Sequence, residues 1–237
     1  MNGENMPENM PAPEEEPDMS LRRYVKWAII AALVIIIIGV SVSVLRGCDR
    51  VDDPVPDTET KETEDPGWDV PDYVDVRLIP KNEYSRPGTS LEKVNGIVVH
   101  YVANPGSTAE GNRSYFAGLA ESGATYASSN FIIGLDGEVI QCVPADEVAY
   151  ASNERNGDTL SIECCHPDET GKFTDFTYKS LVKLCADICK EFGLDPEKDI
   201  IRHYDVTGKM CPLYFVEHED EWKSFLGDVK TEMNSKK

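Results

Sequence analysis

A histidine and a cysteine that could bind one metal ion lie eight positions apart in the last fifth of the chain. His203 and Cys211 flank a loop that contains a glycine, so the chain can turn and bring both side chains together. Neutral imidazole and thiolate are good zinc ligands, and His100, at the end of an apolar run, supplies a third donor. Three protein ligands with one open position are typical of a catalytic zinc site, whereas a structural site would need a fourth ligand.

Each of these residues also has a simpler interpretation. A histidine at a strand end often forms only surface hydrogen bonds, and Cys211 could be a small buried residue. His166 and His218 compete as ligands. His166 precedes a proline in a polar loop, and His218 lies in an acidic run at an expected helix start, so we expect neither to bind the metal.

Four segments have the order and the residue types of one enzyme family. They read VVHY at 98–101, SSNFIIGLDGEVIQCVP at 128–144, DTLSIECC at 158–165 and RHYDVTGKMCP at 202–212. Together they resemble the zinc-dependent N-acetylmuramoyl-L-alanine amidases, which include bacteriophage amidase-type lysozymes and peptidoglycan recognition proteins. The resemblance covers roughly residues 90–225. It implies a peptidoglycan hydrolase that cleaves the amide bond between N-acetylmuramic acid and L-alanine with water activated by zinc.

The resemblance also implies a role for five residues. His100, His203 and Cys211 would bind Zn²⁺. Glu163, on an otherwise apolar strand, would act as the catalytic base, and Lys209 would stabilise the oxyanion. The complete set favours an enzyme over the alternative function, a peptidoglycan-binding module without catalytic activity.

One position departs from the family pattern. Some members carry a catalytic tyrosine just before the second strand, where this chain reads Ser129-Asn130-Phe131. Tyr126 lies three positions too early to replace it. The function of the base therefore falls to Glu163.

Hydrophobic patterns predict the elements that carry these residues. Alternating or β-branched runs indicate strands, an Asp-Gly turn indicates a hairpin, and three- and four-residue spacing indicates amphipathic helices. The predicted strands are 96–101, 130–134, 139–143, 160–165 and 199–203, and the predicted helices are 113–122, 176–192 and 217–233. Strands and helices intermix, which indicates an α/β fold. The resemblance implies a single domain with a central mixed β-sheet flanked by helices.

The pairing of the other cysteines of this region stays open, because an exported domain could contain a disulfide. Cys185 and Cys189 lie on the apolar face of helix 176–192, where we expect them to pack in the core. Cys164 and Cys165 point to opposite faces of a strand, and Cys142 could meet one of them.

The N-terminal third predicts one transmembrane helix with polar flanks. Residues 1–21, acidic and rich in proline, indicate a disordered cytoplasmic tail. Residues 22–46 read as a signal anchor, whose uncharged run 27–45 is long enough to cross a bilayer. Residues 47–77 read as an acidic, proline-rich spacer, and 78–237 as the zinc amidase domain.

The flanks of the apolar run predict its orientation. Basic residues are more frequent before it than after it, which favours an N-terminus inside the cell and a catalytic domain outside. A cleaved signal peptide would have a shorter apolar core. The sequence Leu45-Arg46-Gly47-Cys48 resembles a lipoprotein box, but Arg46 fits that motif poorly. We therefore predict a single-pass protein of the bacterial cell membrane.

The charge excludes one class of partner. The chain of 237 residues has 43 acidic and 23 basic side chains, a formal net charge of −20, whereas nucleic-acid binders show a basic surface. Residues 78–237 hold 26 acidic and 16 basic side chains, so half of the net charge precedes them. The predicted partners are peptidoglycan and the membrane, and the oligomeric state stays open.

Overall fold

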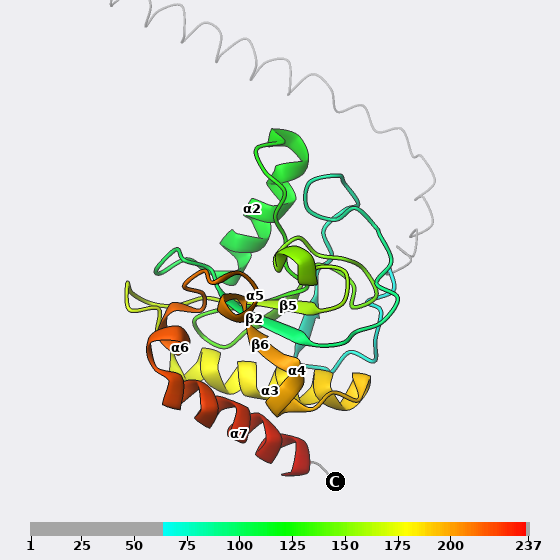
Figure 1. Ribbon diagram of the computed structural model, residues 1–237. Coiled ribbons are helices and arrows are strands. Elements are labelled where there is room, and N and C mark those ends of the chain that lie inside the picture. The colour runs from blue at the N-terminus through cyan, green and yellow to red at the C-terminus, as the bar shows by residue number, and fades with distance from the viewer. Residues whose placement is uncertain (1–63, 236–237) are drawn as a thin grey trace, which may run out of the picture. The chain divides into compact units, whose positions relative to one another are not determined.

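A mixed sheet with the strand order β1-β4-β3-β5-β2-β6 lies at the centre of the structure (Figure 1). The structure is a computed structural model that describes residues 64–235. Strands β3 and β4 are antiparallel, and the other neighbouring strands are parallel. The strands are β1 (Val74–Val76), β2 (Ile97–Tyr101), β3 (Phe131–Ile133), β4 (Val139–Gln141), β5 (Leu160–Cys164) and β6 (Ile200–Arg202). The predicted α/β class and the predicted hairpin, β3–β4, are confirmed.

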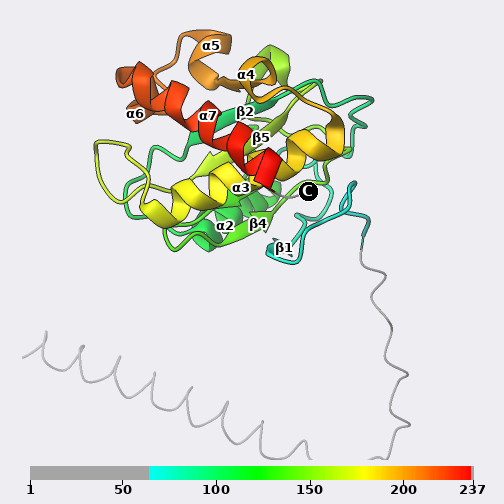
Figure 2. The same ribbon diagram turned by 90° about the horizontal axis from the view of Figure 1, so that it is seen from below.

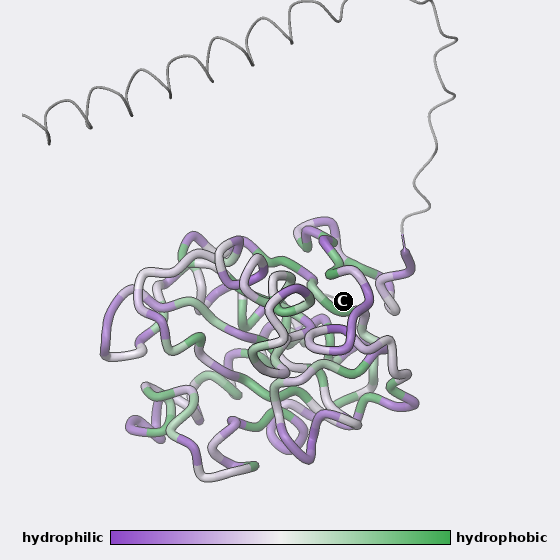
Figure 3. The backbone as a smooth tube through the Cα atoms, turned by 90° about the horizontal axis from the view of Figure 1, so that it is seen from above, coloured by the Kyte–Doolittle hydropathy of each residue, from purple (hydrophilic) through white to green (hydrophobic). Residues whose placement is uncertain are grey.

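Helices cover both faces of this sheet. Helices α3 (Asp175–Phe192) and α7 (Glu219–Ser235) lie on one face, and α2 (Ala109–Ser122) lies on the other (Figures 1 and 2). The short elements are η1 (Asn153–Arg155), α4 (Pro196–Asp199), α5 (His203–Thr207) and α6 (Leu213–Glu217). In the tube view, the hydrophobic stretches run mainly through the interior and the hydrophilic ones through the outer loops (Figure 3).

The alternation of side chains along β5 divides the core in two. Ile162 and Cys164 pack with α3 and α7, whereas Cys165, just beyond the strand, packs with α2. Cys164 and Cys165 therefore point to opposite sides of the sheet, as predicted. Cys185 and Cys189 of α3 are buried in the first of these cores, and the six cysteines within residues 64–235 are all free.

Local signals explain where the long helices begin and end. Thr174 caps α3 by accepting a hydrogen bond from the backbone N–H of Thr177, and Gly193 ends the helix in the left-handed conformation, as predicted. Helix α2 begins four residues earlier than predicted because Thr108 caps it at Gly111. The periodic pattern indicated the body of the helix but not this cap.

The sheet begins before residue 78, the predicted boundary between spacer and domain. Strand β1 lies within the predicted spacer and pairs in parallel with β4. Trp68 packs edge-on against Phe131, with ring centroids 5.6 Å apart, and its indole N–H donates to Gln141 Oε1 at 3.2 Å. The prolines and acidic residues of this stretch suggested a solvated chain, but its few large apolar side chains are enough to attach it to the sheet.

The predicted cytoplasmic tail, the predicted transmembrane helix and most of the predicted spacer lie outside the described residues. Within residues 64–235, every helix is too short or too polar to cross a bilayer.

Candidate metal centre

Two parallel strands place the two histidines side by side. Val99 of β2 is paired with Arg202 of β6, so His100 and His203 follow at the same level of the sheet. Val99 packs against the core under α3 and α7, and the alternation of the strand therefore directs His100 to the opposite face. His203 is the first residue of α5.

A tight turn returns the chain to this pair. Helix α5 ends at Gly208, whose φ of 78° lies in the left-handed region that glycine adopts without strain. The backbone N–H of Tyr204 then donates to the carbonyl of Cys211 at 2.9 Å, which closes the loop. This closure places the Cys211 thiol beside the histidines.

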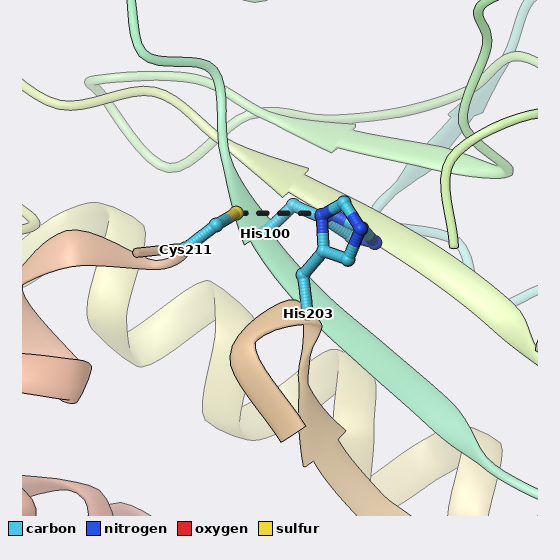
Figure 4. Close-up of side chains that lie close together, drawn as sticks. All are labelled: His100, His203 and Cys211. Carbon is cyan, nitrogen blue, oxygen red and sulfur yellow. Dashed lines mark hydrogen bonds between the residues drawn. The ribbon is translucent and has the colours of Figure 1, made fainter. Parts of the chain in front are cut away.

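The three predicted ligands form one buried cluster (Figure 4). Each offers one ligand atom, and these atoms all lie within 4.8 Å of one another. The Cys211 Sγ and His100 Nδ1 are 3.8 Å apart, and the centroids of the two imidazole rings are 4.6 Å apart. His100 is 2 % exposed, His203 6 % and Cys211 1 %.

Burial favours the neutral forms of both imidazoles and of the thiol. Burial lowers the pKa of His100 well below its ordinary value, with smaller contributions from His203 and Lys209, and it also lowers the pKa of His203. Both imidazoles are therefore neutral at pH 7 and keep a lone pair for a metal. Burial raises the pKa of the Cys211 thiol to about 12, so a thiolate here needs a neighbouring cation.

The second nitrogen of each ring has a partner from one short segment. His100 Nε2 lies 3.1 Å from Ser152 Oγ, and His203 Nε2 lies 2.9 Å from Asn153 Oδ1. A carboxamide oxygen only accepts, so the His203 Nε2–H donates and its Nδ1 carries the lone pair. That Nδ1 atom is buried and has no hydrogen-bond partner among the described residues. Two imidazoles, one of them with this unpartnered nitrogen, and one thiol fit a zinc ion.

Glu163 lies next to the cluster on the neighbouring strand. It is the β5 residue in register with His100 on β2. Its side chain is half-buried as a whole, but the Oε2 atom is buried and has no hydrogen-bond partner among the described residues. Burial raises the pKa of Glu163 to about 8, and the positive charge of Lys209 opposes that rise. A carboxyl group with a pKa near neutrality can both take up and release a proton.

Lys209 lies at the exposed rim of the same site. Its side chain is solvent-exposed, in the loop between α5 and Cys211. Its charge nevertheless lowers the pKa values of His100, His203 and Glu163. The structure thus brings all five predicted site residues to one place.

The rival histidines lie apart from the metal cluster. His166 lies in the loop after β5, as predicted, and is 1 % exposed. Its ring lies 5.0 Å from that of Tyr101, and its Nδ1–H donates to the carbonyl of Asp168 at 2.7 Å. His218 is exposed and stacks on Tyr214 with centroids 4.2 Å apart.

The position of the missing tyrosine has a structural function here. Ser129 and Asn130 are fully buried, and both hydrogen-bond to Ser161 of β5. Tyr126 is exposed, and its hydroxyl donates to Glu83 Oε1 at 2.8 Å. Neither place supplies a catalytic group to the cluster.

Ser152 and Asn153 are the site residues that sequence reasoning missed. They belong to the polar run Ser-Asn-Glu-Arg-Asn at 152–156, which carries no ligand spacing and no apolar period. Only the fold brings this run against the histidines, about 50 residues away in either direction along the chain.

The region of the chain that carries this site matches a family model and curated relatives. The family model described as N-acetylmuramoyl-L-alanine amidase matches residues 90–213, just over half of the chain. The amidase BlyA of Bacillus subtilis (strain 168) is 35 % identical over 178 residues, which cover 67 % of this chain and 47 % of BlyA. The chain thus spans about half the length of the curated relatives it matches.

Solved structures show the same fold at lower sequence identity. The structure of PlyL matches with a TM-score of 0.57 at 22 % identity and covers 66 % of this chain and 96 % of PlyL. The catalytic domain of XlyA matches with a TM-score of 0.55 at 24 % identity and covers 66 % of this chain and 98 % of that domain.

Proposed function

Because this chain belongs to the N-acetylmuramoyl-L-alanine amidase family, we propose that it hydrolyses peptidoglycan at the amide bond between N-acetylmuramic acid and L-alanine, using a zinc ion. The observation that carries the proposal is the convergence of His100, His203 and Cys211 beside Glu163 in a buried cluster. The 35 % identity to an amidase over 178 residues supports the same reaction.

His100, His203 and Cys211 would hold the zinc ion, because their ligand atoms are close together and two of them are neutral nitrogens. When bound there, zinc supplies Lewis-acid chemistry that makes water nucleophilic near neutral pH and polarises the substrate carbonyl. Burial keeps bulk water away from the ligands and strengthens the electrostatic interactions inside the site.

Glu163 would transfer the proton. Its buried Oε2 takes a proton from the attacking water and returns it to the departing amine of L-alanine. A pKa of about 8 suits both steps, because neither protonation state is strongly disfavoured near neutral pH. The single carboxyl group can therefore act as base and then as acid.

Lys209 would stabilise the negative charge that develops on the carbonyl oxygen. Its ammonium lies at the rim, where the charge already acts on both histidines and on Glu163. A fixed positive charge beside a developing oxyanion lowers the barrier without any proton transfer.

The membrane-anchored location is part of the proposal. The uncharged run 27–45 and the basic residues before it support a single-pass anchor with the amidase outside the cell. Fractionation of cells that produce the full chain tests this. We expect the full chain in the membrane fraction and a chain without residues 27–45 in the soluble fraction. Equal recovery of both chains from the soluble fraction would refute the anchor.

Digestion of purified peptidoglycan tests the reaction. The full chain should release stem peptides with new L-alanine amino groups and no new reducing sugar ends, as measured by mass spectrometry and end-group assays. His203→Ala or removal of zinc should reduce this release at least about 100-fold. His218→Ala, a histidine outside the cluster, is the matched control and should leave it unchanged.

Two outcomes would contradict the proposal in different ways. Undiminished release after complete removal of zinc would exclude the zinc mechanism. Binding of peptidoglycan without release of any fragment would favour the non-catalytic binding module.

A further inference from the structure

One short segment contacts both histidines of the predicted metal site. Ser152, just before η1, lies against His100 of β2, and Asn153, the first residue of η1, lies against His203 of α5. Both contacts are made to Nε2, at 3.1 Å and 2.9 Å. Two consecutive residues thus contact two ligands that come from different elements.

The backbone of this segment is held in place by its own hydrogen bonds. The side-chain oxygen of Asn156 accepts from the backbone N–H groups of Ala151 and Ser152, at 3.1 Å and 2.6 Å. The Thr159 hydroxyl donates to the carbonyl of Arg155 at 2.6 Å, which connects the segment to the start of β5. Ser152 is 1 % exposed, so its hydroxyl is confined to the site.

Asn153 adopts a backbone conformation that costs free energy. Its φ of 54° lies in the left-handed region, which side chains other than glycine rarely adopt, although asparagine tolerates it better than most. Such strain persists where the surrounding structure fixes it. Here the strained residue directs its amide oxygen to His203 Nε2.

The contacts occupy Nε2 of each ring and leave Nδ1 for the metal, and the contact with Asn153 also determines the tautomer of His203. The Asn153 oxygen accepts the Nε2–H of His203, so the lone pair is on the buried Nδ1, which has no partner among residues 64–235. His100 likewise presents Nδ1 to the Cys211 sulfur at 3.8 Å and Nε2 to Ser152. A hydrogen bond to the outer nitrogen fixes the tautomer and the orientation of a metal-binding histidine.

We propose that Ser152 and Asn153 are positioning residues that hold both imidazoles with Nδ1 toward the zinc ion and so increase the affinity of the site for zinc. This inference rests on the proposed zinc-dependent function. Two contacts, each between the Nε2 atom of a histidine and a side-chain oxygen, would thereby raise the zinc affinity of the whole site.

Three variants of the full chain separate the side chains from the backbone. Asn153→Gly removes the amide but accepts the left-handed conformation even more readily than asparagine. Asn153→Asp keeps an acceptor oxygen at the same place. Ser152→Ala removes the hydroxyl next to His100. Circular dichroism and urea unfolding of each variant establish that it is folded.

Zinc affinity is measured by competition with a chromophoric chelator, and the ligand geometry by the visible absorption of the cobalt-substituted protein. We expect Asn153→Gly and Ser152→Ala to bind zinc about 10- to 100-fold more weakly than the wild type, with altered cobalt bands. Asn153→Asp should bind zinc at least as tightly as the wild type, because a carboxylate accepts the Nε2–H more strongly than an amide.

The outcomes distinguish this inference from the proposed function. If the wild type binds zinc but Asn153→Gly binds it equally well, the inference is wrong and the proposed function stands. An equal loss of affinity in Asn153→Asp and Asn153→Gly would also refute the inference, because the hydrogen bond would not be the cause. A wild type without measurable zinc binding would refute the zinc-dependent function and this inference together.

Discussion

Glu163 illustrates how the surroundings of a single residue determine its chemistry. In the sequence it is a carboxylate on an apolar strand, and the alternation of β5 alone does not say how deeply it is buried. In the structure one of its oxygens is buried without a hydrogen-bond partner, and burial raises its pKa to about 8. A carboxyl group in solution ionises near pH 4.5 and would be a weak base at neutral pH.

Replacing Glu163 with glutamine tests its role as the base. Glu163→Gln keeps the shape of the side chain but cannot take up a proton, so kcat on peptidoglycan fragments should fall by about 10²- to 10⁴-fold. Zinc content, measured by metal analysis, should not change, because Glu163 is not a ligand in the proposed site. Glu121→Gln, at an exposed position of α2, is the control. A Glu163→Gln enzyme with wild-type kcat would assign the proton transfer to another group.

At the scale of elements, glycines show how local conformation limits substitution. Gly193 ends α3 with a φ of 68°, whereas Gly227 lies within α7. A Cβ atom would meet no other atom within 4 Å at either position. Backbone conformation is therefore the main difference between the two sites.

The same change should have opposite effects at these two glycines. Gly193→Ala should decrease the free energy of unfolding by about 1 kcal/mol, because alanine is strained in the left-handed conformation. Gly227→Ala should increase it by about 0.5–1 kcal/mol, because alanine loses less backbone entropy in a helix. Urea unfolding of the full chain measures both values. A stabilised Gly193→Ala variant would contradict the left-handed cap.

At the scale of the whole molecule, two long-range connections hold the segment before β2 to the rest of the domain. Trp68 and β1 attach to β3 and β4. Arg86, only 2 % exposed, donates to both carboxylate oxygens of Glu147, at 2.8 Å and 3.0 Å, and to the carbonyl of Ile79. The domain therefore includes residues that composition alone assigns to a spacer.

A truncation tests this extension. A chain that begins at residue 78 lacks β1 and Trp68 and should unfold at a lower urea concentration than a chain that begins at residue 62, where the compact unit starts. The difference arises because the edge of β4 and the ring of Phe131 become exposed. Equal midpoints for the two chains would mean that residues 62–77 contribute nothing to stability.

The contact between Arg86 and Glu147 should make stability depend on pH. Burial opposes ionisation of Glu147, but the hydrogen bonds and the charge of Arg86 outweigh it and lower the pKa of Glu147 below its ordinary value of 4.5. This stabilisation is therefore present above about pH 4.5 and is lost as the pH falls through the lowered pKa of the folded state. Below that pH the carboxyl is protonated in both states.

Glu147→Gln measures the effect. The variant should be about 2 kcal/mol less stable at pH 7, because the buried Arg86 loses the bidentate Glu147 carboxylate and keeps only the exposed Glu64 as an anionic partner. It should also lose less stability than the wild type between about pH 5 and pH 3. Glu92→Gln, at an exposed position, should follow the wild type. Parallel pH curves for Glu147→Gln and the wild type would show that another group dominates in this range.

Patterns within short stretches of the chain predicted much of the fold. The β-branched run ending at His100, the hairpin β3–β4 and the amphipathic helix α3 with its cap at Gly193 all follow from local periodicity and turn chemistry. The motif from His203 to Cys211 likewise predicted a shared site, because eight positions and a glycine allow both side chains to meet. These features depend on neighbours in sequence.

The tertiary structure alone decided three other properties. It brought Ser152 and Asn153 against the histidines, it buried one oxygen of Glu163, and it attached residues 64–77 to the sheet. Each depends on contacts between residues far apart in the chain and on exclusion of water, neither of which leaves a periodic signal in the sequence. The residue types of this protein thus determined which metal-binding and catalytic groups are available. The packing of the sheet determined which of these groups are buried and how they are oriented.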